Sequence, residues 1–270
     1  MTGWAAVGSV VLACLCAAAM PAIALEESLE VVATRPGVTT TVLLVSPGTP
    51  PVATVVLFAG GHGGLGLSAA GMAWGQGNFL VRNRERFAQH GFLVAAIDAP
   101  SDRREHALWN FRTTAEHAAD VKAVMAALRA MAPAPVWLIG TSMGTVSVAS
   151  VAARLAAGGG PDGVVLTSSV MRTSRAVGET VWMAKLDRIT VPVLVVHHAH
   201  DACVVSPYGE MRSLLKSLSR AGKKELLTFD GGDPPRSDAC EAFAAHGYVG
   251  LDREVVKAIA DWITGVVNPS

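Results

Sequence analysis

Short apolar runs alternate along this chain with longer stretches that have a helical pattern of apolar positions. The short runs predict β-strands at Leu29–Ala33, Thr40–Val45, Ala53–Phe58, Phe92–Ile97, Val136–Ile139, Gly163–Thr167, Val193–His197 and Glu225–Phe229. The longer stretches predict helices at Phe79–Gln89, Thr113–Met131, Met143–Ala156, Pro207–Arg220 and Asp252–Gly265. Strands and helices therefore alternate over most of the sequence.

The type of each strand indicates how the strands pair. The turn signal RPGVTT between the first two strands favours an antiparallel pair. Later strands, such as the one in PVLVVHH, are continuous apolar runs between helices, which is typical of parallel strands covered on both faces. The sequence thus predicts an α/β fold: a doubly wound, mostly parallel eight-stranded sheet with helices on both faces and right-handed crossovers. No repeat or low-complexity linker divides the chain, so residues 25–270 are expected to form one domain.

Composition and charge narrow the class of protein. The chain has 270 residues, 51% of them hydrophobic and 16% charged, which indicates one large folded domain and excludes a disordered chain. The 22 basic and 22 acidic residues balance, and neither sign forms a long run. We therefore expect no nucleic-acid partner and no binding to an anionic membrane.

The first 24 residues differ in kind from the rest of the chain. They contain no Asp, Glu, Lys or Arg and end in Ala-Ile-Ala before a polar segment, which predicts a secretory signal peptide (residues 1–24) cleaved after Ala24. An uncleaved membrane anchor is the alternative, because the segment before the apolar run has no Lys or Arg and the run nearly reaches spanning length. We expect a periplasmic or secreted protein with no stable membrane association after cleavage.

The segment Gly140-Thr141-Ser142-Met143-Gly144 places a serine between two glycines, directly after a predicted strand and directly before a predicted helix. This strand–turn–helix context is the one in which G-x-S-x-G forms a nucleophile elbow, because the strained turn leaves no room for neighbouring β-carbons. Such a bend exposes the Ser142 hydroxyl beyond the carboxyl end of the sheet, where open α/β sheets bind their ligands. The alternative is a tight turn with a spectator serine.

With this motif in this context, the chain resembles the α/β-hydrolase superfamily over essentially all of residues 25–270. The resemblance implies a Ser-His-Asp triad in the chain order Ser, Asp, His. It assigns the nucleophile to Ser142, the acid to Asp201 after the strand Val193–His197, and the base to His246 before the last helix. A loop-capping carboxylate and an ordinary loop histidine are the alternatives for the last two residues.

Other titratable residues compete for these roles. The alternative acids, which all follow the last strand, are Asp230, Asp233 and Asp238. The histidines that precede the predicted acid, and are therefore poor candidates for the base, are His197, His198 and His200. Two of them, His198 and His200, share one face of an extended segment as metal ligands do, but no HExxH-type spacing accompanies them. We therefore predict no metal and no cofactor.

The family also implies an oxyanion hole made of two backbone N–H groups. One belongs to Met143, the residue after the nucleophile. The other lies in the glycine-rich segment AGGHGGLG after the strand Ala53–Phe58, at Gly61 or His62. A merely flexible turn is the alternative for this segment.

The segment between Thr167 and Val193 is too short for the helical cap that many family members insert there. An open site follows, as in capless esterases and dienelactone-hydrolase-like proteins. Candidate residues for its substrate pocket are Met72, Trp74 and Trp182, for which ordinary packing is the alternative.

Two cysteines, Cys203 and Cys240, remain after the predicted signal peptide. If Asp201 and His246 are hydrogen-bonded partners, the loops that carry these cysteines must meet. Export and the triad together predict a Cys203–Cys240 disulfide bond, with a free pair of thiols as the alternative.

The leading interpretation is an exported serine hydrolase that cleaves a small-molecule carboxylic ester through an acyl-enzyme. The same machinery also suits a peptidase, amidase or thioesterase of the same superfamily. A non-catalytic binding protein on a hydrolase scaffold is a third interpretation, disfavoured because all three triad positions are filled.

Overall fold

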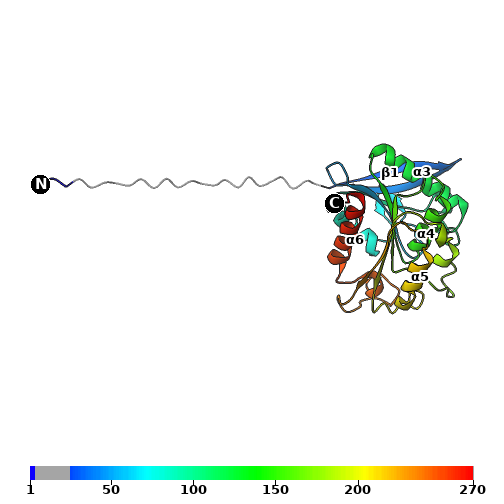
Figure 1. Ribbon diagram of the computed structural model, residues 1–270. Helices are drawn as coiled ribbons and strands as arrows, with labels where there is room; N and C mark the ends of the chain where they lie inside the picture. Colours follow the sequence, from blue (N-terminus) through cyan, green and yellow to red (C-terminus); the bar gives the residue numbers. More distant parts are fainter. Residues whose placement is uncertain (4–24, 270) are drawn as a thin grey trace.

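The computed structural model describes residues 1–3 and 25–269 (Figure 1). Residues 4–24 of the predicted signal peptide, with its cleavage site, lie outside the described residues. Eight strands form the main sheet, in the order β1-β2-β6-β3-β7-β8-β9-β10. Their bounds are β1 Glu26–Arg35, β2 Val38–Ser46, β3 Ala53–Phe58, β6 Phe92–Ile97, β7 Val136–Thr141, β8 Gly163–Thr167, β9 Val193–His198 and β10 Lys224–Phe229.

The pairing of these strands confirms the predicted mostly parallel sheet. β1 pairs with β2 and β2 with β6 in antiparallel fashion, and the remaining neighbours are parallel. Every residue of β3, β6, β7, β8 and β9 is buried, because helices cover both faces of these strands. The last strand, β10, lies at the edge of the sheet and is only partly buried.

Helices cover the sheet in two layers (Figure 1). One layer consists of α3 (Ala115–Met131), α4 (Gly144–Arg154) and α5 (Met211–Ser217), which share one apolar cluster with the sheet. The other consists of α1 (Phe79–Arg82), α2 (Arg84–Gln89) and α6 (Asp252–Val267), which share a second cluster with the opposite face. The helices on both faces that the sequence predicts are confirmed.

One predicted helix is divided in two, and another is shorter than expected. The helix predicted at 79–89 is divided at Asn83, whose N–H bonds to the Leu80 carbonyl and whose side chain donates to the Phe79 carbonyl and to Asp252. The helix predicted at 207–220 consists of the 3₁₀ turn η4 (Tyr208–Glu210) and α5, which ends at Ser217.

The carboxyl ends of the parallel strands lie at one end of the sheet, where the loops carry the candidate site residues. The helical elements of residues 168–192 are the 3₁₀ turns η2 (Val181–Met183) and η3 (Leu186–Arg188), so no large cap covers this end. The loop before α1 contains a small hairpin, β4 (Leu67–Ser68) with β5 (Gly71–Met72). Among the described residues, no helix is both long enough and apolar enough to span a membrane.

Candidate active site

Ser142 lies at the turn between β7 and α4, with its backbone in the left-handed region at φ 53°. This conformation is strained for a residue with a side chain. Three hydrogen bonds hold it: the Ser142 N–H donates to the Thr167 carbonyl at 3.0 Å, and the Ser142 carbonyl accepts from the Thr145 N–H at 2.9 Å and from the Thr145 hydroxyl at 2.6 Å. A β-carbon at Gly140 would meet the Gly144 carbonyl, and one at Gly144 would collide with the Phe58 carbonyl. The turn therefore needs both glycines of the motif.

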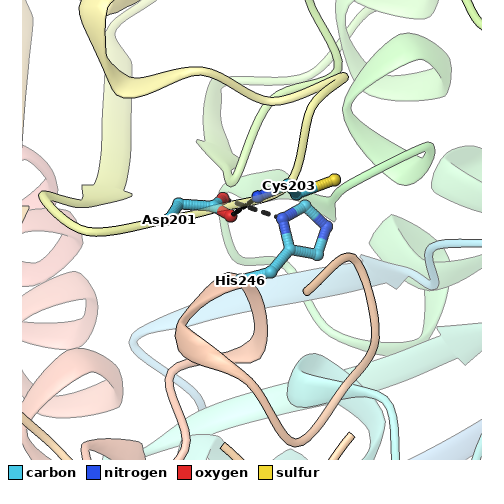
Figure 2. Close-up of side chains that lie close together, drawn as sticks. All are labelled: Asp201, Cys203 and His246. Carbon is cyan, nitrogen blue, oxygen red and sulfur yellow. Dashed lines mark hydrogen bonds and ion pairs between the residues drawn. The ribbon is translucent and has the colours of Figure 1, made fainter. Parts of the chain in front are cut away.

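Asp201 and His246 come together from loops 45 residues apart, after β9 and before α6 (Figure 2). Nδ1 of His246 lies 2.8 Å from Oδ2 of Asp201, and both side chains are buried. A carboxylate at Nδ1 favours the tautomer that protonates this nitrogen and leaves Nε2 free to accept a proton. No described residue pairs with Nε2 of His246, which is buried.

The loop of His246 is fixed by residues distant in the chain. Ser168 donates to the His246 carbonyl at 2.7 Å. Arg82, in α1, donates to the carbonyls of Gly247 at 2.6 Å and Ala242 at 3.0 Å. The imidazole is therefore held through its backbone on both sides.

A disulfide bond joins Cys203 to Cys240, as predicted. The same Cys203 donates its backbone N–H to Oδ1 of Asp201 at 2.9 Å. Each carboxylate oxygen of Asp201 thus has its own donor, and the loops on either side of the Asp201–His246 pair are covalently linked.

His197 is a second histidine in contact with Asp201. Its Nε2 lies 3.4 Å from Oδ2 of Asp201 and 3.0 Å from the Ser206 carbonyl. A carbonyl accepts only from a protonated nitrogen, so Nε2 carries the proton. Burial lowers the pKa of His197 to about 4, and the ring is neutral at physiological pH. Its place before the acid in the chain disfavours His197 as the base, and the structure shows it four residues from Asp201 and in contact with that carboxylate.

The N–H groups predicted for the oxyanion hole lie beside the elbow. A β-carbon added to Gly60 would come 3.0 Å from the Ser142 β-carbon, so the glycine-rich loop approaches the serine directly. Gly60 accepts from the Gly63 N–H at 3.1 Å, which folds residues 60–63 into a turn. Within the described residues, the N–H groups of Gly61, His62 and Met143 donate to no protein acceptor. These three backbone N–H groups therefore have no acceptor among the described residues.

These groups surround one cavity of about 630 Å³. It is lined by Ser142, Met143, His246, Gly61 and His62 and by apolar side chains that include Val170, Val205 and Trp74. The rings of Trp74 and His62 are in contact, with centroids 4.0 Å apart and planes inclined by 42°. Of the three pocket residues predicted from sequence, the structure places only Trp74 in this wall.

Met72 and Trp182 require a correction. Met72 belongs to β5 and packs against the cluster that contains Leu65 and Val81, beside a different groove. Trp182 belongs to η2 and is partly exposed outside the cavity. The hairpin of β4 and β5 places Met72 beside this groove and outside the wall of the cavity that Ser142 lines.

The competing residues have other contacts. Both ring nitrogens of His198 are hydrogen-bonded, Nε2 to the Gly231 carbonyl and Nδ1 to the His200 N–H. Asp230 lies 3.3 Å from His200 on an exposed surface. Asp201, Cys203 and His246 also form a cluster of ligand-type side chains, but the sulfur is in a disulfide and is no thiolate donor (Figure 2).

Comparisons with known proteins agree with this architecture. No family model and no curated protein matches the sequence. A carboxyl esterase from Bacillus coagulans is similar in structure, with 15% identity, a TM-score of 0.60 and coverage of 92% of this chain and 100% of that one. An esterase from Pyrococcus furiosus has 14% identity, a TM-score of 0.63 and coverage of 88% and 90%. A lidless α/β serine hydrolase from Xanthomonas campestris has 17% identity, a TM-score of 0.56 and coverage of 88% and 95%.

At identities of 14%, 15% and 17%, the structural similarity shows a shared fold alone. The chain has the fold of the α/β serine hydrolases without a lid, as its sequence predicts.

Proposed function

We propose that this protein is an exported serine hydrolase that cleaves carboxylic esters through an acyl-enzyme intermediate. The observation that carries the proposal is the 2.8 Å contact between His246 and Asp201 beside a serine on a strained strand–helix turn. The serine and the histidine line the same cavity. The similar structures named as esterases support the same reaction class.

In the first half of the reaction, the Ser142 hydroxyl attacks the ester carbonyl while Nε2 of His246 takes its proton. Asp201 keeps the imidazole in the required tautomer and stabilises the imidazolium. The negative charge on the carbonyl oxygen is met by the Met143 N–H and by an N–H of Gly61 or His62. The alcohol then leaves with the proton from His246.

In the second half, water replaces the alcohol. His246 takes a proton from the water, which attacks the acyl-serine, and the acid is released as the proton returns to Ser142. The cavity wall is largely apolar, with Phe79, Val170, Val177, Val204 and Val205, which suits an apolar acyl group.

Export is part of the proposal. The uncharged first 24 residues and the disulfide between the two remaining cysteines support a periplasmic or secreted protein, since disulfides persist in oxidising compartments. N-terminal sequencing of the exported protein tests the cleavage site. We expect the mature chain to begin at Leu25.

The activity is tested on the mature chain and its Ser142→Ala variant, with p-nitrophenyl esters of increasing acyl length and with peptide p-nitroanilides. We expect ester turnover that Ser142→Ala abolishes. Ser217→Ala, at a half-buried serine in α5 whose hydroxyl donates, among the described residues, to the Ser213 carbonyl, is the matched control and should retain full turnover. Equal turnover by Ser142→Ala would contradict the nucleophile, and stronger anilide turnover would favour a peptidase.

A further inference from the structure

Arg112 is a fully buried arginine that lies against the glycine-rich loop after β3. The contact is so close that a β-carbon on Gly63 would come 2.5 Å from the Arg112 guanidinium. A glycine at this position lets the loop backbone pack directly against the Arg112 guanidinium.

The guanidinium joins two segments of the candidate site. Its Nη2 donates to the Gly61 carbonyl at 2.8 Å, and its Nη1 donates to Oγ of Ser147 at 2.9 Å. Gly61 belongs to the loop that offers one oxyanion donor, and Ser147 belongs to α4, which begins just after the other donor, Met143. The planar guanidinium of Arg112 therefore connects the two segments that carry the proposed oxyanion-hole donors.

The hydrogen bond to Gly61 also sets the direction of the next N–H. In a trans peptide the C=O and N–H groups point in opposite directions, and no described peptide bond is cis. With its carbonyl held by Arg112, the Gly61–His62 peptide turns the His62 N–H away from the guanidinium. A donor on the carbonyl also polarises that N–H. The Leu108 N–H fixes the following carbonyl, that of His62, at 2.9 Å.

The charge on Arg112 is costly to bury. Desolvation lowers its pKa to about 10, which Glu179 partly opposes, so the guanidinium remains charged at neutral pH. Among the described residues no carboxylate lies within ion-pair distance of it, and its Nε has no partner. Burying a cation without a paired carboxylate carries a desolvation cost. Near a developing oxyanion, however, a fixed positive charge is favourable.

We propose that Arg112 is a positioning residue that fixes the two segments of the oxyanion hole relative to one another. The inference rests on the proposed function, because it assigns Arg112 a part in stabilising the tetrahedral intermediate. It predicts that Arg112 acts on the transition state and not on the binding of the ground-state ester.

The main test replaces Arg112 by Lys, which keeps the charge but cannot bridge Gly61 and Ser147 as a planar fork does. We expect Arg112→Lys to lower kcat by about 10- to 100-fold with KM nearly unchanged, since small misplacements of catalytic groups have effects of this order. Affinity for a trifluoromethyl ketone, which forms a tetrahedral adduct, should fall by the same factor as kcat/KM. Active sites are counted with a fluorophosphonate so that kcat refers to folded enzyme.

Two further variants separate positioning from stability. Ser147→Ala removes only the α4 end of the bridge and should lower kcat by about 3- to 10-fold. Arg129→Lys is the control, because Arg129 also donates to a backbone carbonyl, that of Gly160, and to Asp162, at the opposite end of the sheet. It should lower the unfolding temperature and leave kcat unchanged.

The inference would be overturned if Arg112→Lys and Ser147→Ala both retained the wild-type kcat per active site. If Arg112→Lys does not fold, Ser147→Ala decides alone. Failure of the proposed function is seen separately, as a wild-type protein without Ser142-dependent ester turnover.

Discussion

The backbone N–H of Cys203 donates a 2.9 Å hydrogen bond to Asp201, while the sulfur of the same residue is bonded to Cys240. Cys240 lies on the segment that leads to His246. The disulfide therefore links the same two loops that the Asp201–His246 hydrogen bond joins, and it restrains the acid through Cys203, two residues further along the chain.

Replacing both cysteines, as in Cys203→Ala/Cys240→Ala, should destabilise the fold and weaken catalysis. The bond joins positions 37 residues apart, and losing a loop closure of this size costs about 3–4 kcal/mol in free energy of unfolding in the chain-entropy model. We expect kcat to fall by about 2- to 10-fold, because Asp201 loses a fixed neighbour. Urea unfolding and titrated active sites measure the two effects. An unchanged unfolding midpoint, or no response of the wild type to a reductant, would contradict this role.

Asp201→Asn tests the acid. The amide presents an N–H where the imidazole needs an acceptor, so the ring adopts the wrong tautomer and kcat should fall by about 10³–10⁴-fold. Circular dichroism establishes that the fold is retained. Asp230→Asn is the matched control at a competing acid, since Asp230 is exposed and its carboxylate pairs, among the described residues, with His200 and with the N–H of its own neighbour Gly231. If Asp230→Asn were the more damaging change, the acid would be misassigned.

Most of the fold follows from local sequence patterns. All eight strands of the sheet lie where apolar runs predict them, because a run bounded by turn residues marks a strand regardless of its partners. The break at Asn83 could not be predicted in this way. It depends on a contact with Asp252, which is 169 residues away.

Some residues of the candidate site can likewise be located from sequence patterns, and others cannot. A motif in its strand–turn–helix context locates Ser142, and chain order locates Asp201 and His246. Arg112 has no such signal, because its partners Gly61 and Ser147 are 51 and 35 residues away and an arginine in a loop usually faces solvent. Burial of a charge is a property of tertiary packing, which a single sequence does not display.

Acid should destabilise the protein through His117. This histidine is buried in α3 between Phe58 and Phe111, and neither ring nitrogen has a partner among the described residues. Burial, followed by the charge of Arg112, lowers its pKa from 6.5 to about 3. Between these two values the unfolded chain binds a proton that the folded chain excludes, so stability is full above the upper value and falls as the pH is lowered.

His117→Leu removes this proton uptake. The free energy of unfolding of the wild type should fall more steeply than that of the variant, by about 1.4 kcal/mol per pH unit between those two pKa values. Urea unfolding at a series of pH values measures the slopes. His90→Leu, at an exposed histidine, controls for the substitution itself. Parallel slopes for the wild type and His117→Leu would show that His117 is not excluded from protonation.

Trp74 should select the acyl group, because its ring lines the cavity and packs against His62 at the oxyanion loop. We expect Trp74→Ala to lower kcat/KM by about 10-fold for long-chain p-nitrophenyl esters and less for the acetate, since a longer chain covers more of the lost apolar surface. Met72→Ala and Trp182→Ala are matched controls outside the cavity and should keep the wild-type profile of activity against chain length. An equal loss for all chain lengths would instead assign Trp74 to support of the loop, and a changed profile in either control would move the acyl site toward that residue.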